Sequence, residues 1–226
     1  MELLNELKKD FRFVEGFKAC ISCGTCTAIC PAAEFRDYDP RIITEIVQRG
    51  NEDELEKLLK SDTIWFCGEC LSCKTRCPRG NTPGYIIQSL RALSIKTGFF
   101  ICSEQGRKQL AIKRTVGDHI LKYGYCVYLD EVDTKMYPEQ GPVWDWLKEN
   151  RFEILERLNT NYNKTGKGTL RLTSEESLSD LKKIFDETGG TERLNLIEEY
   201  SQKAAEKMGI EFSEGKDEYF MEIYEK

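Results

Sequence analysis

Apolar side chains recur at helical spacing along most of the chain, and the breaks between these stretches fall at proline or glycine. Before residue 100 the pattern predicts three main helices, which begin at Asp39-Pro40, Asn51 and Thr82-Pro83. The first begins with an N-cap followed by proline at the first helical position, and the third begins at a Thr-Pro pair. Gly50 and Gly98 follow their last periodic residues and predict their C-terminal turns. A short helix is expected around Leu3, Leu4 and Leu7.

The periodic pattern continues beyond residue 140 and predicts three further helices. They run from Gly141-Pro142 through Leu158, from a capping box at Thr173 and Glu176 through Phe185, and from Thr191 to Gly209. The segment 125–129 is the best candidate for a strand, because β-branched and aromatic residues gather there. The fold class predicted from these patterns is mainly α.

Charge and aromatic residues are distributed unevenly, and this divides the chain. The total is 33 basic and 39 acidic side chains, and the whole excess of six acidic residues lies in 101–226. That segment also contains most of the aromatic residues, including Trp144, Trp146 and Phe220. We therefore predict a compact domain over 1–100 and an acidic, mostly helical extension over 101–226, with the boundary near Gly98.

The overall composition excludes several classes of protein. A formal charge of -6 argues against a nucleic-acid-binding protein. Mean hydropathy is -0.52, and no apolar run approaches the ~20 residues of a membrane-spanning helix. The first residues lack the basic-then-apolar pattern of a signal peptide. A cytoplasmic protein is expected, with any membrane association arising through a complex.

Ten cysteines are present, and eight of them form two runs with the same spacing, C-x-x-C-x-x-C-x-x-x-C-P. The runs comprise Cys20, Cys23, Cys26 and Cys30, and Cys67, Cys70, Cys73 and Cys77. This is the run of bacterial two-cluster ferredoxins, in which the fourth cysteine binds the other cluster. The spacing predicts two [4Fe–4S] clusters. One is assigned to Cys20, Cys23, Cys26 and Cys77, and the other to Cys67, Cys70, Cys73 and Cys30.

Two other uses of the cysteines are weaker. Structural zinc sites usually pair two C-x-x-C units and need neither a third cysteine at the same step nor the final C-x-x-x-C-P. Disulfides are disfavoured because the cytosol keeps thiols reduced.

The side chains that flank the runs leave alternatives open. Lys74, Arg76 and Arg79 surround the last cysteine of the second run. They can offset the charge of about 2− on each oxidised cluster site, raise its potential or dock an acidic partner. The alternative is that they are simply solvated.

The remaining reactive side chains show no pattern of a catalytic site. Cys102 and Cys126 match no ligand spacing and are expected to be small buried residues. His119, the only histidine, is expected at the surface or at a helix cap. No Ser/His/Asp set, P-loop or G-x-G-x-x-G run is present, and Glu198 with Glu199 is interpreted as a solvated helix face. No catalytic residue is predicted.

Duplicated cluster motifs joined by helices resemble the alpha-helical ferredoxin fold, and within it the HdrC-like iron–sulfur subunits of heterodisulfide reductase and their bacterial relatives. The resemblance is carried by residues 19–31, 65–80 and 82–87. It implies a non-catalytic electron-transfer subunit of an oxidoreductase complex, placed between two partner subunits, one that contains flavin and one that is disulfide-active. Residues 123–126 and 138–144 resemble the bacterial complex linked to cytoplasmic sulfur oxidation.

Absent motifs separate the chain from related families. Iron–sulfur subunits of succinate dehydrogenase add a C-x4-C-x2-C run, and those of glycolate oxidase continue into domains with adjacent cysteines. This chain has neither. The alternatives to a subunit of a complex are a stand-alone ferredoxin serving several oxidoreductases and a zinc-stabilised interaction module.

The extension is expected to dock the partner subunits, because a solvated tail would have little use for its large aromatic residues. Those residues are Trp144, Trp146, Phe152 and Phe220. The alternative is that they pack the extension onto its own cluster domain.

Overall fold

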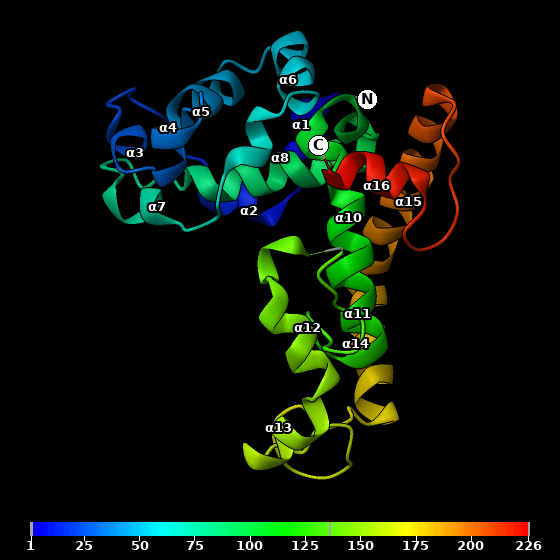
Figure 1. Ribbon diagram of the computed structural model, residues 1–226. Helices are drawn as coiled ribbons and strands as arrows, with labels where there is room; N and C mark the ends of the chain where they lie inside the picture. Colours follow the sequence, from blue (N-terminus) through cyan, green and yellow to red (C-terminus); the bar gives the residue numbers. More distant parts are fainter. Residues whose placement is uncertain (1, 136, 226) are drawn as a thin grey trace. The chain divides into compact units, whose positions relative to one another are not determined.

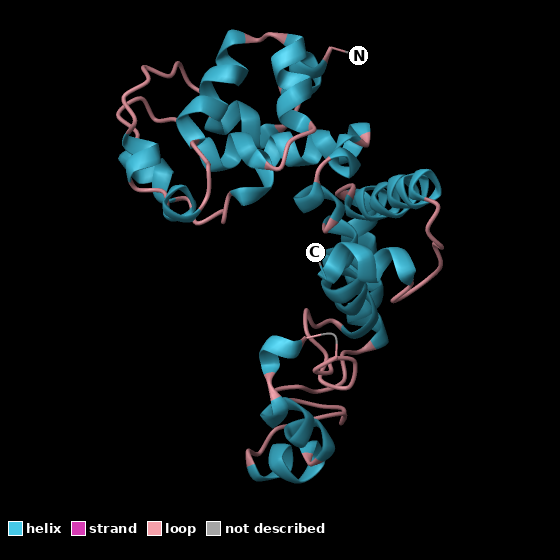
Figure 2. Ribbon diagram, turned by 45° about the horizontal axis from the view of Figure 1, so that its top comes forward, coloured by secondary structure: helices cyan, strands magenta, loops and turns pink. Residues whose placement is uncertain are grey.

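The computed structural model describes residues 2–135 and 137–225, and within those ranges it contains helices and loops but no strand (Figure 2). The prediction of a mainly α fold is confirmed. The chain divides into two compact units, unit 1 with Met1–Gln109 and Leu196–Lys226, and unit 2 with Leu110–Asn195. No described helix is both long enough and apolar enough to cross a bilayer.

Unit 1 is built from short helices around one long one (Figure 1). Its first part contains α1 (Leu3–Leu7), α2 (Phe11–Gly16), α3 (Thr25–Ala28), α4 (Pro31–Phe35), α5 (Pro40–Arg49), α6 (Glu52–Leu59), α7 (Ser72–Arg76), α8 (Pro83–Thr97) and α9 (Glu104–Arg107). Two 3-10 turns, η1 (Thr63–Phe66) and η2 (Phe99–Cys102), lie among them.

Local signals set the ends of the main helices as predicted. The Asp39 side chain caps α5 by accepting from two backbone N–H groups of its first turn. Asn51 caps α6 in the same way through Glu54 N–H. Gly50 and Gly98 follow α5 and α8 with φ of 66° and 75°, a left-handed conformation that glycine adopts without steric cost.

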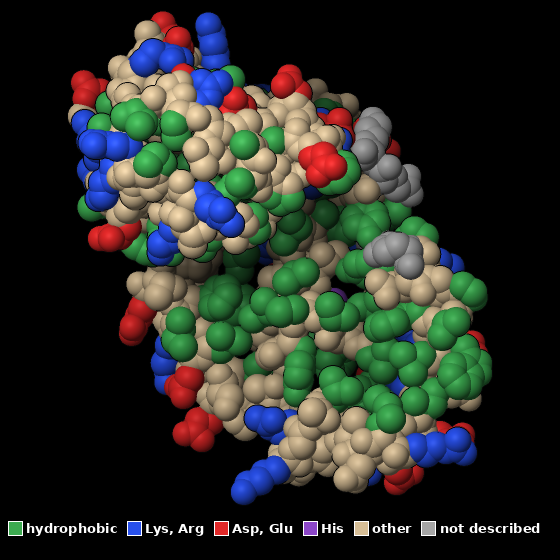
Figure 3. All heavy atoms as spheres, turned by 90° about the vertical axis from the view of Figure 1, so that its left-hand side faces the viewer, with side chains coloured by type: hydrophobic (Ala, Val, Ile, Leu, Met, Phe, Trp, Pro, Cys, Tyr) green, Lys and Arg blue, Asp and Glu red, His purple; other side chains and the backbone are tan. Residues whose placement is uncertain are grey.

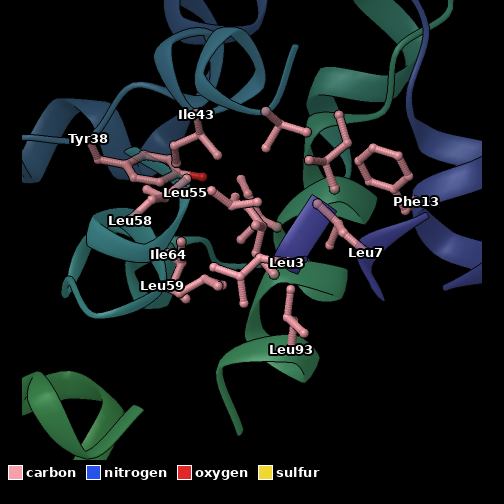
Figure 4. Close-up of a cluster of buried hydrophobic side chains, with 14 residues drawn as sticks. Leu3, Leu7, Phe13, Tyr38, Ile43, Leu55, Leu58, Leu59, Ile64 and Leu93 are labelled. Carbon is pink, nitrogen blue, oxygen red and sulfur yellow. The ribbon is translucent and has the colours of Figure 1, made fainter. Parts of the chain in front are cut away.

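The core of unit 1 lies between α1, α5, α6 and α8 (Figure 4). It comprises Leu3, Leu7, Phe13, Tyr38, Ile43, Val47, Leu55, Leu58, Leu59, Ile64, Ile86, Ile87, Leu90 and Leu93. The spacing of its last four members places one face of α8 inward. Each fully buried side chain of this size stabilises the fold by about 1.5–3 kcal/mol. Because α8 also contacts α2 and α7, this core holds the cysteine loops in place.

The end of the chain belongs to unit 1. Tyr200 packs on Gly98, where an added Cβ would lie 2.4 Å from the ring, and edge-on to Phe100. Tyr219 and Phe220 in α16 (Glu218–Glu225) are fully buried. These contacts group 196–226 with the cysteine region in unit 1. The predicted boundary near Gly98 instead places all of 101–226 in one extension.

Unit 2 contains α10 (Gln109–Ile112), the π-helical turn η3 (Lys113–Gly117), α11 (Asp118–Tyr123), η4 (Pro138–Gln140), α12 (Pro142–Glu149), α13 (Arg151–Arg157) and α14 (Glu175–Glu187). The helix α15 (Gly190–Met208) begins in this unit. The helix predicted from Gly141-Pro142 through Leu158 is divided at Asn150 into α12 and α13.

Two predicted features of unit 2 are wrong. Ser174, not Thr173, caps α14, because the Thr173 hydroxyl donates instead to the carbonyl of Tyr123. The segment 125–129 forms no strand. Its aromatic residues make side-chain contacts instead of ladder pairs, since the Tyr128 ring stacks on Tyr123 with centroids 4.0 Å apart and Tyr125 donates to the carbonyl of Arg171.

Candidate metal centres

The two cysteine runs fold into loops of the same backbone conformation. Two residues after the first cysteine, φ is 57° at Ser22 and 54° at Glu69. Four residues after it, φ is 76° at Gly24 and 57° at Leu71. A left-handed conformation costs a residue other than glycine about 1–2 kcal/mol. Its repetition at the same two positions indicates that the spacing imposes one loop shape.

Each loop folds back onto its first sulfur. The backbone N–H of Ser22 donates to Cys20 Sγ, and that of Glu69 donates to Cys67 Sγ, both at 3.4 Å. Backbone N–H groups directed at cysteine sulfurs are a common feature of iron–sulfur sites. Both loops therefore present their first sulfur in the same hydrogen-bonded setting.

The second cysteine of each run is also matched in the two loops. Cys23 Sγ lies 3.4 Å from the Thr25 hydroxyl, and Cys70 Sγ lies 3.4 Å from the Ser72 hydroxyl. These hydrogen bonds lower the pKa of both thiols. Thr25 and Ser72 thus occupy equivalent positions in the two loops and make equivalent hydrogen bonds.

The third cysteines, Cys26 and Cys73, are partly buried. Desolvation raises the pKa of Cys26 to about 11 and that of Cys73 above its ordinary value. A thiol in such a place becomes a thiolate readily only when a cation or metal compensates for the lost water.

A cavity brings the first three cysteines of one run together with the last cysteine of the other. It is lined by Cys20, Cys23, Cys26 and Cys77, with Arg79 and Asn81 beside them. The contact of α3 with α7 produces this arrangement, since α3 contains Cys26 and Cys77 directly follows α7 (Figure 1). The four residues assigned to the first cluster therefore line one cavity.

Tyr38 connects cysteines of the second set. Its side chain is buried, and burial raises its pKa well above the ordinary value for tyrosine. The thiol of Cys67 raises that pKa further, followed by Cys30 and Cys73, so all three lie near the phenol. Cys30 and Cys67 also pack against the buried core that contains Tyr38, whereas Cys70 is exposed.

The first loop is held by α5. The backbone N–H of Cys20 donates to Gln48 Oε1 at 2.6 Å, and Gln48 Nε2 donates to the Cys20 carbonyl at 3.3 Å. The Arg41 guanidinium donates to the Ser22 hydroxyl and to Glu45. The Ser22 hydroxyl, followed by Arg41, lowers the pKa of Glu45.

The second loop is held by α8 through Arg91. Its guanidinium donates to the carbonyls of Ile64 and Cys67, both at 2.7 Å, and to Glu69 Oε1 at 2.5 Å. The same group lies 5.5 Å from the centre of the Trp65 ring. No motif in the sequence marks Arg91 or its counterpart Gln48, because each acts across a long separation in the chain.

The residues of the first cavity fit an iron–sulfur cluster. Thiolates are the ligands such clusters need, and hydrogen-bond donors to sulfur accompany them. Asn81 supplies an unused donor, because its buried Nδ2 has no hydrogen-bond partner. Nothing in the sequence pattern marks this residue except its place four residues after Cys77.

The flanking basic residues of the second run lie at the surface. Lys74, Arg76 and Arg79 are exposed, and Lys74 Nζ lies 5.3 Å from the centre of the Tyr85 ring. Figure 3 views the molecule from the side on which α3 and α7 lie in Figure 1, and Lys and Arg side chains are spread over that part of unit 1.

The two unassigned cysteines are exposed, so the prediction that they are buried is wrong. Cys102 ends the turn η2, in which Phe100 takes the buried position. Cys126 lies in the surface loop that follows the left-handed Gly124. His119 lies on α11, with its ring edge-on to Tyr123.

Comparison with known proteins agrees with this geometry. Residues 16–81 match the model of the 4Fe-4S dicluster domain. This range covers both cysteine runs and ends at Asn81. The [4Fe–4S] cofactor predicted from the spacing is confirmed by this match, and the presence of two cysteine sets is consistent with two clusters.

Several similar proteins belong to heterodisulfide reductases. The chain is 35% identical over 158 residues to the C subunit of the ferredoxin:CoB-CoM heterodisulfide reductase of Methanosarcina acetivorans, and the match covers 69% of this chain and 60% of that protein. It is 33% identical over 145 residues to the iron-sulfur C subunit of the CoB–CoM heterodisulfide reductase of Methanopyrus kandleri, covering 61% of this chain and 74% of that protein.

A further relative is matched over a shorter range. The iron-sulfur C subunit numbered 2 of the CoB–CoM heterodisulfide reductase of Methanocaldococcus jannaschii is 35% identical over 114 residues, which cover 50% of this chain and 54% of that protein. The shared part thus spans about half to three quarters of these proteins. Given the two cysteine loops and these relatives, the chain belongs to the HdrC family, the iron–sulfur C subunits of heterodisulfide reductase.

Proposed function

We propose that this chain relays electrons through two [4Fe–4S] clusters between the flavin-containing and the disulfide-active subunits of a heterodisulfide-reductase-like complex. One cluster would be held by Cys20, Cys23, Cys26 and Cys77, and the other by Cys67, Cys70, Cys73 and Cys30. Each cluster carries one electron, so the pair supplies the two electrons that reduction of a disulfide requires. The chain itself performs no bond chemistry.

The observation that carries this proposal is the cavity lined by three cysteines of the first run and Cys77 of the second. Because the runs exchange their last cysteine, both sites lie in one small domain. Short separation is what electron transfer between clusters needs. A stand-alone ferredoxin would use the same cavity, but the relatives are named as subunits, and this favours a complex.

Cluster content is the first test. Protein purified without oxygen should contain about eight iron and eight sulfide per chain and show the brown colour of iron–sulfur proteins. Stoichiometric zinc in place of iron would exclude an electron-transfer role. Purification of the complex at high salt then distinguishes a bound subunit from a diffusing carrier, which would be lost.

The extension is proposed to dock these partner subunits. Phe220 is buried within unit 1, so this residue packs the extension onto the domain that contains the cysteines and is not available to a partner. Val143 and Trp146 on α12 and Phe152 on α13 are exposed, with 71%, 57% and 59% of their surface accessible. Large exposed apolar side chains of this kind are typical of protein interfaces.

Substitution of the exposed residues tests docking of the partner subunits without removing any buried side chain. Trp146→Ala combined with Phe152→Ala should keep both clusters and weaken co-purification with the two partner subunits. Phe11→Ala is the matched control, because Phe11 is 73% exposed but lies in unit 1. Co-purification at the wild-type level in the double variant would contradict docking through this surface.

The terminal substrate is proposed to be a disulfide bound by the disulfide-active partner. The names of the relatives favour the CoB–CoM heterodisulfide, whereas residues 123–126 and 138–144 favour the sulfur-oxidation complex. Oxidation of the reduced complex by CoB–CoM heterodisulfide, followed at the cluster absorbance, separates the two. Rapid reoxidation would support the CoB–CoM heterodisulfide as substrate, and no reoxidation would support a role in sulfur oxidation.

A further inference from the structure

We infer that the Asn81 side chain donates a hydrogen bond to the cluster bound by Cys20, Cys23, Cys26 and Cys77, and so raises the reduction potential of that cluster above the value set by the cysteines alone. The inference rests on the proposed cluster function. It adds a residue in direct contact with the cluster that no cysteine motif contains.

Two hydrogen bonds fix Asn81 where the two runs cross. Its backbone N–H donates to Cys77 Sγ at 3.3 Å. Its Oδ1 accepts from the backbone N–H of Lys18 at 2.7 Å, two residues before Cys20. The next residue is held as well, since the backbone N–H of Thr82 donates to the Gly16 carbonyl at 2.7 Å. Asn81 therefore joins the end of one run to the start of the other.

Close packing of α2 on α8 allows this crossing. A Cβ on Gly16 would lie 2.7 Å from the Cβ of Tyr85 and 3.1 Å from the Thr82 carbonyl oxygen. Only glycine permits that approach without displacing backbone. As a result, the chain preceding Cys20 runs beside the turn that carries Asn81.

These contacts determine which way the amide points. Because Oδ1 is engaged by Lys18, the Nδ2 end of the same planar group is directed elsewhere. Asn81 is only 2% exposed, lines the cysteine cavity and has no partner for Nδ2. A buried amide N–H without an acceptor costs about 1–3 kcal/mol, so the fold bears this cost unless the cavity supplies an acceptor. Cluster and cysteine sulfurs are such acceptors.

A donor at this place favours the reduced cluster. Reduction adds one negative charge, and hydrogen bonds to charged acceptors are stronger than those to neutral ones. Hydrogen bonding to the sulfurs is one of the determinants of cluster potential. The second cluster has no such amide at the equivalent position, since four residues after Cys30 the chain has Glu34, an exposed acid.

Isotope labelling tests the contact directly. Wild-type protein is prepared with 15N in the asparagine side-chain amide, reduced and measured by pulsed EPR. Among the described residues that line the cavity, Asn81 is the one asparagine. We expect a 15N coupling to one cluster, and its loss in Asn81→Asp, which keeps an oxygen for Lys18 but has no N–H to donate.

Redox titration gives the second readout. In Asn81→Asp the ratio of reduced to oxidised first cluster at a fixed solution potential should fall at least tenfold, a shift of about 59 mV for one electron. The potential of the other cluster should stay unchanged. Asn51→Ala is the control, because it removes a helix cap and destabilises unit 1 without touching the cavity.

The outcomes separate this inference from the proposed function. Wild-type protein that contains iron and sulfide but shows no 15N coupling overturns the role of Asn81 alone. Equal potentials in wild type and Asn81→Asp do the same. Should Asn81→Asp fail to assemble, the labelled wild type still decides. Wild-type protein without iron or sulfide overturns both proposals.

Discussion

The two cysteine loops have the same shape but are held by different chemistry. Both have left-handed residues at the same two positions and both direct a backbone N–H at their first cysteine. The first loop, however, is anchored by the neutral amide of Gln48 on α5, and the second by the guanidinium of Arg91 on α8. Loop geometry therefore follows from cysteine spacing, while the surroundings that distinguish the clusters come from distant helices.

The largest expected effect is the loss of a whole cluster, and it tests whether the two runs exchange their last cysteines. Cys77→Ala should remove the cluster of the first run, and Cys30→Ala that of the second, each with loss of about four of eight iron atoms. Cys23→Ala and Cys70→Ala provide the reference spectra.

The residual EPR spectrum identifies the cluster that is lost. Cys77→Ala should resemble Cys23→Ala, and Cys30→Ala should resemble Cys70→Ala. The opposite pairing would show that each run binds its own cluster and that the crossed ligand set is wrong.

Removal of the two anchors should affect the loops unequally. Arg91 has three short hydrogen bonds and a side chain that is 13% exposed, so Arg91→Ala should lower the free energy of unfolding by about 3 kcal/mol. Gln48→Ala, which removes neutral and more exposed bonds, should cost about 1 kcal/mol. Cluster absorbance followed in rising urea under argon measures both.

Arg91→Lys sharpens this test. Lysine keeps the charge but cannot reproduce the fork of parallel N–H groups that reaches Ile64, Cys67 and Glu69. It should therefore behave more like Arg91→Ala than like wild type. Full rescue by lysine would show that charge alone holds the loop.

A smaller effect is expected from Gly24→Ala. A Cβ at Gly24 meets no atom within 4 Å, so its cost is the left-handed conformation alone, about 1–2 kcal/mol. Gly68→Ala is the matched control, since that site is equally open and its φ is not positive. The same urea titration compares them, and equal stability of the two variants would refute a conformational cost at Gly24.

The smallest effect concerns the cysteines outside the runs. Cys102→Ala and Cys126→Ala should keep the full iron content and both EPR signals, because both thiols are exposed and neither lies in a loop of the repeated shape. Loss of iron from either variant would add a ligand that the spacing does not contain.

The sequence predicts the helices of unit 1 well, because their signals are local. Asp39, Asn51 and Gly98 act on their own helix ends, within a few residues. It predicts the last long helix equally well, from Thr191 to Gly209 against α15 at Gly190–Met208. Helix α16 is not predicted, because it is short and its buried Tyr219 and Phe220 form no extended periodic pattern.

In the candidate site, too, the sequence identifies residues with local signals and misses those that act from distant helices. The eight cysteines can be identified from their spacing, but Gln48 lies 28 residues from Cys20, and Arg91 lies 24 residues from the carbonyl of Cys67 that it binds. Such partners become visible only when the helices are packed. The exposure of Cys102 cannot be read from the sequence for a similar reason, since only the geometry of the turn η2 shows that Phe100 is the inward residue.

The hydrogen bond between Lys18 and Asn81 also bears on how the protein is made. It spans 63 residues and joins the segments that frame the first cavity. During synthesis the first three cysteines leave the ribosome well before Cys77 and Asn81, so the cavity cannot close on a partial chain. Contacts this far apart form late in folding, and metal binding is coupled to that step. Insertion of the first cluster is therefore expected after the second run has been translated, as one cooperative event with the closure of unit 1.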